Sequence, residues 1–208
     1  METLHLQDHR AEIHKVVVGP LDNNVFVLRC RHTGEAVLID AADEPDRLLP
    51  MCRELGVRSV LQTHGHHDHI QAVPAVRRAG YQVAVSPADA FMLEGRDKWA
   101  GHDTVIEEGS VLAMGRLRLE VLATPGHTPG SLCFRLAGSP VLFSGDTLFP
   151  GGPGATGGDP GRFATIIDQI SDKLLVLDPE TVVLPGHGPD TTIGAERPHL
   201  TEWVARGW

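Results

Sequence analysis

The sequence predicts a mixed α/β protein in which β-sheets pack together and helices cover their outer faces. Strand patterns dominate the chain, and helical patterns stand between groups of strands, which is typical of layered architectures. The second half repeats the plan of the first, and no linker interrupts the series. With 208 residues, 41% of them hydrophobic, the chain suffices for one sizeable core. We therefore expect a single domain over residues 1–208.

Short apolar runs bounded by turn residues predict five strands in the first half. The first three form a meander, and the turn over residues 31–34 joins its second and third strands. A hairpin is expected around Met114 and Gly115. The five strands are expected over residues 13–18, 24–29, 35–39, 57–61 and 82–85.

Two helices are expected between these strands and a third after the last of them. In the first helix, Asp43 is the expected N-cap, Pro45 fits the first turn and Gly56 ends the helix. An apolar-periodic run over residues 70–79 predicts the second helix. A third, short helix is expected after Pro87.

The second half contains strands over residues 131–136 and 141–143 in succession. A helix over residues 163–177 follows, then a strand over residues 181–184. A short helix ends the chain. The alternation of strand groups and helices therefore continues to the C-terminus.

The strand at residues 57–61 leads into the run THGHHDH, which is rich in metal-binding side chains. Along extended backbone, residues two apart project to one side, so His64 and His66 can aim at one point while Gly65 allows a tight bend. Asp68 and His69 fall at the start of the next helix, where free N–H groups favour a carboxylate and the side chains diverge toward a second point. The run therefore predicts a site for zinc or another first-row metal.

A solvated, histidine-rich loop is the alternative interpretation of this run. Three further candidate ligands weaken it, because each stands at a strand end bracketed by glycine or proline. They are His127 in TPGHTPG, Asp146 in SGDT and His187 in PGHG. Asp40 also ends a buried strand; it is either a partner that orients a metal-binding histidine or an ordinary turn residue.

The ordered series THGHHDH, TPGHTPGS, SGDTLF and PGHG, preceded by DNNVFVL and VLID, resembles the metallo-β-lactamase-fold hydrolases. Within them it is most similar to the glyoxalase II (hydroxyacylglutathione hydrolase) branch, and the match spans nearly the whole chain. The resemblance implies a four-layer αββα sandwich with two metals at one edge, between the sheets. It assigns His64, His66 and His127 to the first metal, Asp68, His69 and His187 to the second, and Asp146 to both. His67 lies outside this pattern.

The resemblance also implies an activity, a thioesterase in which a hydroxide shared by two metals attacks the carbonyl of an S-acyl thiol such as S-lactoylglutathione. Asp68 and Asp146 would be the carboxylates of the catalytic centre. Zinc is the expected metal, with iron and manganese as alternatives. Two divalent cations, two carboxylates and a hydroxide carry a net charge of about +1, which suits an anionic substrate or a developing oxyanion.

The segment over residues 149–162 contains too many glycines and prolines for a regular element, and it follows Asp146 directly. We expect it to overhang the site and to gate the substrate. Its candidate residues are Phe149, Gly151, Gly152 and Arg162. Arg162 would meet an anionic group of the substrate or cap local backbone.

Other functions of the same fold are alternatives. A persulfide dioxygenase would use one iron, held by His64, His127 and Asp146, whereas the intact PGHG favours two metals. A phosphodiesterase or another ester hydrolase would use the same metals, but the net charge of −9 disfavours a nucleic-acid substrate. A β-lactamase would need export. A structural or metal-storage protein would close its sites with protein ligands, whereas seven ligands at two metals leave room for substrate.

The remaining features concern location and partners. The first ten residues are polar, and no run reaches membrane-spanning length, so a cytoplasmic protein without membrane contact is expected. Cys30, Cys52 and Cys133 lack paired spacing and are expected to be buried apolar residues. Full-length glyoxalase II enzymes bind glutathione through a helical C-terminal extension, whereas this chain ends at Trp208. The thiol carrier and the oligomeric state therefore stay open.

Overall fold

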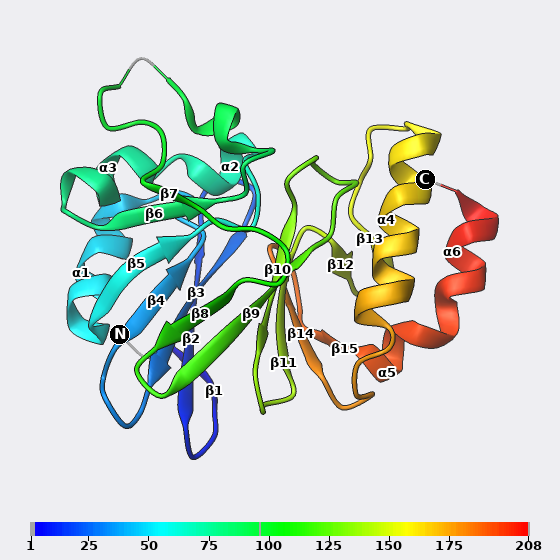
Figure 1. Cartoon of the computed structure of the whole chain (residues 1–208), viewed down its shortest axis with the longest axis horizontal. Coiled ribbons are helices and arrows are strands. Elements are labelled where there is room, and N and C mark those ends of the chain that lie inside the picture. Colours follow the sequence, from blue (N-terminus) through cyan, green and yellow to red (C-terminus); the bar gives the residue numbers. More distant parts are fainter. Residues whose placement is uncertain (1–2, 96, 208) are drawn as a thin grey trace.

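Two β-sheets pack face to face in the computed structural model, and helices cover both outer sides (Figure 1). The structure describes residues 3–95 and 97–207. Helices α1 (Pro45–Leu55) and α3 (Val73–Arg78) flank one sheet, and α4 (Pro160–Gln169) and α6 (Leu200–Arg206) flank the other. The predicted four-layer αββα sandwich is therefore confirmed.

The first sheet has seven strands in the order of the sequence. Its early strands pair antiparallel, and from β4 onward the pairs are parallel because helical segments return the chain to the same edge. The carboxyl ends of the parallel strands therefore meet at one edge. The strands are β1 (Leu4–Gln7), β2 (Ala11–Val18), β3 (Asn23–Cys30), β4 (Ala36–Ile39), β5 (Val57–Leu61), β6 (Gln82–Val85) and β7 (Thr104–Val105).

The second sheet has the order β15-β14-β11-β10-β9-β8, and a two-stranded ribbon of β12 and β13 lies apart from it. Its strands β11 and β14 are parallel, so their carboxyl ends also meet at one edge. The strands are β8 (Val111–Met114), β9 (Leu117–Ala123), β10 (Leu132–Leu136), β11 (Val141–Gly145), β12 (Leu148–Phe149), β13 (Gly152–Pro153), β14 (Val182–Pro185) and β15 (Thr191–Thr192).

Three apolar clusters hold the four layers together. Between the sheets, the rings of Phe26 and Phe143 meet edge to face at 5.5 Å. Leu48 belongs to the cluster under α1 and α3, and Trp203 to the cluster under α4 and α6. All three cysteines are buried and free, as predicted. Within the described residues, none of the helices has the length and apolar character needed to span a membrane.

The first helix differs from the prediction at its start. Glu44, in the left-handed region at φ 47°, occupies the N-cap in place of Asp43. Asp43 instead accepts the Glu44 N–H at 2.6 Å, so its carboxylate serves the turn and not the helix. The predicted end is confirmed, because Gly56 adopts φ 76° and its N–H bonds the Cys52 carbonyl.

The helix expected over residues 70–79 is two short helices, α2 (His67–Ile70) and α3. Pro74 has no N–H to bond the Ile70 carbonyl, and it stands in the first turn of α3, where that N–H is not needed; this favours a new helix start over a continuous helix. The intervening Ala72 donates its N–H to the Ala41 carbonyl at 3.0 Å. The short helix after Pro87 is the 3₁₀ turn η1 (Ala90–Leu93).

The prediction that residues 149–162 contain no regular element is wrong. β12 and β13 pair within this segment, and α4 begins at Pro160 because the Asp159 carboxylate caps its first turn. The helix therefore starts three residues before the predicted boundary. It continues as a π turn, η2 (Ile170–Leu174), and the C-terminal end consists of α5 (Ile193–Glu196), η3 (Arg197–His199) and α6.

Candidate metal centre

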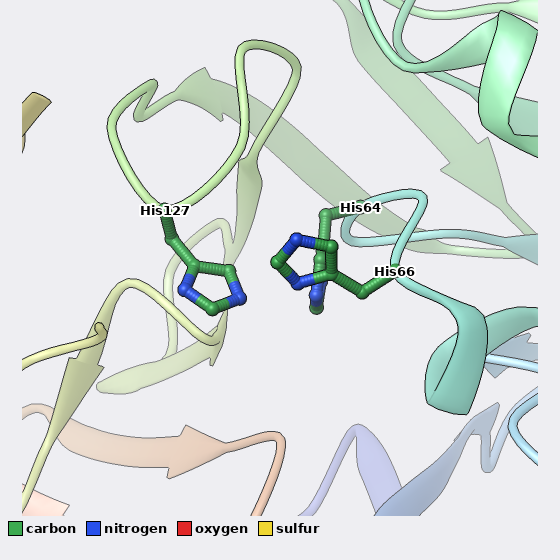
Figure 2. A group of neighbouring side chains, drawn as sticks. All are labelled: His64, His66 and His127. Carbon is green, nitrogen blue, oxygen red and sulfur yellow. The ribbon is translucent and has the colours of Figure 1, made fainter. Parts of the chain in front are cut away.

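All seven candidate ligands lie at one edge of the sandwich, where strands of both sheets end. The first four follow β5 or stand on α2; His127 lies between β9 and β10, Asp146 follows β11, and His187 follows β14. The rings of His64, His66 and His127 point toward one another (Figure 2). Their centroids lie 4.4 to 4.9 Å apart. This is the first group of side chains able to hold a metal.

Asp68, His69 and His187 form a second group. The Nε2 atoms of His69 and His187 are 3.2 Å apart, and the Asp68 carboxylate lies 3.3 Å from His187 Nε2 and 3.5 Å from His69 Nε2. Ligands at zinc distances of about 2.0–2.1 Å in a tetrahedron are separated by about 3.3 Å. The separations in the second group therefore match those around a small metal ion.

Asp146 lies between the two groups. One carboxylate oxygen is 3.4 Å from His69 Nε2, and the other is 3.4 Å from His127 Nε2. The second of these oxygens is also 3.7 Å from His187 Nε2, so the carboxylate as a whole lies beside both groups. The structure brings together all seven residues that the sequence singled out, whereas His67 is exposed at the start of α2 and belongs to neither group.

Four of the histidines use Nδ1 in a hydrogen bond with the protein. Carbonyl and carboxylate oxygens only accept, so Nδ1 carries the proton and Nε2 is left for the centre. At His64 the same holds, because the Thr63 hydroxyl donates to Asp40 and therefore accepts from the ring. The acceptors are Thr63 Oγ1 for His64 (3.0 Å), Asp40 Oδ2 for His69 (2.8 Å), Ala155 O for His127 (2.7 Å) and Leu21 O for His187 (2.8 Å).

Three buried atoms at the centre make no hydrogen bond within the described chain. They are His64 Nε2, His127 Nε2 and Asp146 Oδ1. Buried polar atoms without a partner are costly and therefore need a ligand to explain them. Their chemistry, two imidazole nitrogens and a carboxylate oxygen, fits a first-row metal ion.

Asp40 forms hydrogen bonds that support histidines of both groups. It is 2% exposed and accepts hydrogen bonds from the Thr63 N–H, the Thr63 hydroxyl and the His69 ring. Through Thr63 it also fixes the ring of His64. Of the two interpretations of Asp40, the structure therefore favours the partner that orients metal-binding histidines.

The charges of the centre differ between the two groups. Burial lowers the pKa of His64, His66 and His127. Burial also opposes charge on His69, but the Asp40 carboxylate outweighs it and raises the pKa of His69 to about 9. In the same way the Asp68 carboxylate raises the pKa of His187. The hydrogen bond with His187 in turn holds the pKa of Asp68 well below its usual range.

Asp89 is a site residue that the sequence analysis missed. Its buried carboxylate accepts from the Gly65 N–H at 2.9 Å, the Thr128 hydroxyl at 2.6 Å and the Gly130 N–H at 2.7 Å. It therefore ties the loop of His64 and His66 to the loop of His127. In the sequence this aspartate resembles an ordinary helix cap, and its partners lie about 24 to 41 positions away.

Asn23 and Asn24 were part of the matched series but had no predicted role. The Asn23 amide donates to Asp68 at 2.9 Å. The Asn24 amide donates to the carbonyls of Pro185 and Gly188, both at 2.9 Å. Asn24 thus fastens the PGHG loop to the start of β3, and Asn23 fastens the start of β3 to Asp68 on α2.

Two glycines let backbone approach the ligands. A Cβ at Gly186 would lie 2.3 Å from Asp146 Oδ1 and 2.7 Å from His69, and a Cβ at Gly154 would lie 1.9 Å from the Asp146 carbonyl. No side chain fits at either place. The predicted backbone role of the glycine beside His187 therefore has a specific cause, which is contact with the ligands themselves.

The candidate substrate segment is fastened to the protein at several points. Arg162, on α4, donates to the backbone carbonyls of Gly126 (2.9 Å) and His127, so it fastens the distant His127 loop and does not cap its own local backbone. The Phe149 ring lies 6.5 Å from the His187 ring. Gly151 is exposed, whereas Gly152 is buried. Gating by this segment stays a prediction.

The geometry can be compared with known proteins. A family model described as the metallo-beta-lactamase superfamily matches residues 18–187. The chain belongs to the metallo-beta-lactamase superfamily. The resemblance seen in the sequence motifs is thereby confirmed at the level of the superfamily, whose relatives include metallo-hydrolases.

Several relatives in the superfamily cover most of the chain. An uncharacterised Mycobacterium tuberculosis protein is 38% identical over 206 residues, covering 86% of this chain and 92% of that protein. The probable metallo-hydrolase YqgX of Bacillus subtilis is 32% identical, covering 88% of this chain and 93% of that protein. The hydroxyacylglutathione hydrolase GloC of Haemophilus influenzae is 33% identical, covering 78% and 84%.

Solved structures of the superfamily share the fold. BLEG-1, described as a B3 metallo-beta-lactamase, matches with a TM-score of 0.81 and 32% identity, covering 90% of this chain and 97% of that chain. ETHE1 from Myxococcus xanthus matches with a TM-score of 0.76 and 30% identity, covering 91% of this chain and 84% of that chain. TTHA1623 in a di-iron-bound form matches with a TM-score of 0.72 and 36% identity, covering 88% of this chain and 96% of that chain. The metal of superfamily members thus includes iron.

Proposed function

We propose that the protein is a two-metal hydrolase that cleaves thioesters of small thiols, with S-lactoylglutathione as the first substrate to test. The observation that carries the proposal is the second group, Asp68, His69 and His187, which stands complete beside the first. A one-iron dioxygenase needs only one set of three ligands. A second set with ligand-like spacing therefore favours two-metal hydrolysis over the iron alternative.

In this proposal His64, His66 and His127 hold one metal, and Asp68, His69 and His187 hold the other. Asp146 contributes to both, because its carboxylate lies 3.4 Å from a histidine nitrogen of each group. When bound, divalent metals supply Lewis acidity and lower the pKa of water from 15.7 to about 7. Zinc is the proposed metal.

The protein's own groups prepare the centre. Hydrogen bonds at Nδ1 hold four rings with Nε2 inward, so little reorganisation is needed on metal binding. The low pKa of Asp68 keeps its carboxylate charged at neutral pH, and Asn23 fixes its orientation. All three cysteines are buried, so none is a nucleophile for an acyl substrate.

The choice of a thioester rests on the relatives. GloC of Haemophilus influenzae is named a hydroxyacylglutathione hydrolase, and so is a Rhodospirillum rubrum protein that is 35% identical over 180 residues. BLEG-1 is described as a metallo-beta-lactamase, so a β-lactam is one competing substrate. A persulfide is the other, because a one-iron persulfide dioxygenase is the alternative that the sequence motifs left open. A cytoplasmic location is part of the proposal, because three free buried thiols fit a reducing compartment.

The test combines metal analysis with three substrates. Purified protein, Asp146→Ala and the exposed-site control Asp172→Ala are analysed for metal content and assayed with S-lactoylglutathione, a β-lactam, and a persulfide under oxygen monitoring. We expect about two metals per chain and thioester hydrolysis that only Asp146→Ala loses. A single iron with oxygen uptake on persulfide would overturn the proposal, and hydrolysis of the β-lactam alone would replace its substrate.

A further inference from the structure

The glycine-rich stretch after Asp146 links the metal centre to the C-terminal helices. On its inner side, the Ala155 carbonyl accepts the Nδ1 proton of His127 at 2.7 Å. The Gly154 N–H donates to the Thr147 carbonyl at 3.1 Å. This bond holds Gly154 and the neighbouring Ala155 carbonyl close to Asp146. Residues 151–155 therefore determine which nitrogen of His127 faces the centre.

The same stretch is held from its outer side by α5 and α6. The Gly151 N–H donates to the Glu196 carboxylate at 2.9 Å, and the Gly151 carbonyl accepts from Arg206 at 3.3 Å. A Cβ added at Gly152 would lie 3.4 Å from the ring of Trp203, which is itself buried. We call Glu196, Trp203 and Arg206 the C-terminal clamp.

Glu196 is the central residue of the clamp. It is 5% exposed, and its second oxygen accepts the Thr191 hydroxyl at 2.6 Å. A buried carboxylate needs such partners, and here two hydrogen bonds from the protein supply them. If Gly151 moves away, one of the two buried oxygens loses its partner, which couples the position of the loop to α5.

We propose that the C-terminal clamp, through Glu196 and the 151–155 backbone, positions the imidazole of His127 and thereby sets the metal affinity of the first group. Glu196 is a positioning residue, since Gly151 and Ala155 separate it from the centre. The second group takes its Nδ1 partners from Asp40 and Leu21, which lie outside this loop. The clamp therefore reaches the Nδ1 partner of a first-group histidine and not the Nδ1 partners of the second group.

The first measurement needs no metal and does not depend on the proposed function. In ¹⁵N-histidine-labelled, metal-free protein at about pH 8, above the ordinary histidine pKa, long-range ¹H–¹⁵N correlation reports the tautomer of each ring. In the unmodified protein we expect the neutral His127 ring to carry its proton only on Nδ1. In Glu196→Ala we expect a mixture of the two neutral tautomers. His64, held by Thr63, should not change.

Conservative and control variants separate positioning from general damage. Glu196→Gln keeps an oxygen for the Gly151 N–H and should retain the single tautomer. Glu202→Ala changes an exposed carboxylate on α6 and should have no effect. If Glu196→Ala does not fold, Arg206→Met removes the bond to the Gly151 carbonyl and should still produce the mixture. An unchanged His127 in a folded Glu196→Ala or Arg206→Met protein would overturn the proposal, as would equal changes at His64.

The second measurement rests on the proposed two-metal function. Direct partners of metal-binding histidines typically contribute 10- to 100-fold in affinity, so a residue one step further away should contribute about 3- to 10-fold. In a competitive zinc titration, Glu196→Ala should weaken one of two binding events by that factor and leave the other unchanged. Equal weakening of both events would overturn the selectivity of the clamp, whereas a single binding event would count against the two-metal function alone.

Discussion

Each of four histidines at the centre gives one ring nitrogen to the protein and keeps the other for the site. The sequence identifies the histidines, but their partners are a threonine hydroxyl, an aspartate and two backbone carbonyls that no spacing rule connects to them. At the residue scale, the chemistry of the centre therefore depends on contacts as much as on residue types.

The two glycines of PGHG test this dependence on contacts. In Gly186→Ala the new Cβ collides with Asp146 and His69, so we expect loss of bound metal and at least a 100-fold fall in turnover. Gly188 has open space around it but a φ of +71°, so Gly188→Ala should cost only about 1–2 kcal/mol of stability and keep its metal. Metal analysis and urea unfolding of both variants check this. Equal metal loss in both would contradict it.

The pKa values predict that the two groups respond differently to pH. The pKa of His69, raised to about 9, and the raised pKa of His187 mean that metal must displace protons from the second group. Its affinity should rise about tenfold per pH unit for each proton displaced, until the pH passes the raised values. The first group, with lowered pKa values, should show a flat response above about pH 6.5.

Competitive zinc titrations across this pH range measure both affinities. The stability of the metal-free protein should change with pH in the opposite direction, falling as the pH rises. The raised pKa of His69 stabilises the fold at pH values below its unfolded value, and this contribution disappears as the pH rises through about 9. Two binding events with the same pH dependence would contradict the assignment of charge to the second group.

At the scale of elements, loops from different strands are tied together by buried side chains. Asp89 precedes η1, yet it joins the loop after β5 to the loop before β10. Asn24 joins β3 to the loop after β14. These ties explain why side chains on separate loops are held at ligand distances without a regular element beneath each one.

Removal of the Asp89 carboxylate should loosen both histidine loops. Hydrogen bonds to charged groups contribute about 1.5–3 kcal/mol each and are not additive, so Asp89→Ala should lower the free energy of unfolding by about 3 kcal/mol or more. Thr128→Val removes only one of the three bonds and should cost about 1–2 kcal/mol. Urea unfolding of metal-free protein measures both, and equal losses would refute the role of Asp89 as a tie between loops.

At the scale of the whole molecule, the candidate metal centre joins the two halves of the chain. Four candidate ligands follow β5 in the first sheet, and three come from the connections of the second sheet. Both sheets present the carboxyl ends of their parallel strands at the same edge, so these distant segments meet there. Bound metal should therefore stabilise the packing of one sheet on the other.

Chelation tests this stabilisation. Metal at 100 times its dissociation constant stabilises the folded protein by about 2.7 kcal/mol. For a chain of this size, about 1 kcal/mol shifts the thermal unfolding midpoint by about 2–4 °C. Chelation should therefore lower the Tm by about 5–10 °C. His66→Ala should reduce this shift. The neighbouring variant His67→Ala should keep it, because His67 is exposed and lies outside both groups. Loss of the shift in His67→Ala would contradict the ligand assignment.

Sequence patterns predicted most strands and the position of every candidate ligand, because apolar periodicity and glycine or proline punctuation are local signals. They failed in three places, and only the third involves a contact between residues distant in the sequence. Asp43 serves a turn, Pro74 divides a helix, and the glycine-rich segment forms a ribbon against the C-terminal helices. Each depends on a hydrogen bond, or the loss of one, that periodicity does not report.

The sequence by itself determined the fold family and the set of candidate metal ligands, since both are recorded in residue types and their order. Only the tertiary structure decided how these side chains are used. Asp40 orients two rings, Asp89 ties two loops and Arg162 holds the backbone at His127. The physical reason is that hydrogen bonds and burial act between atoms close in space, and folding brings together groups separated by tens of residues.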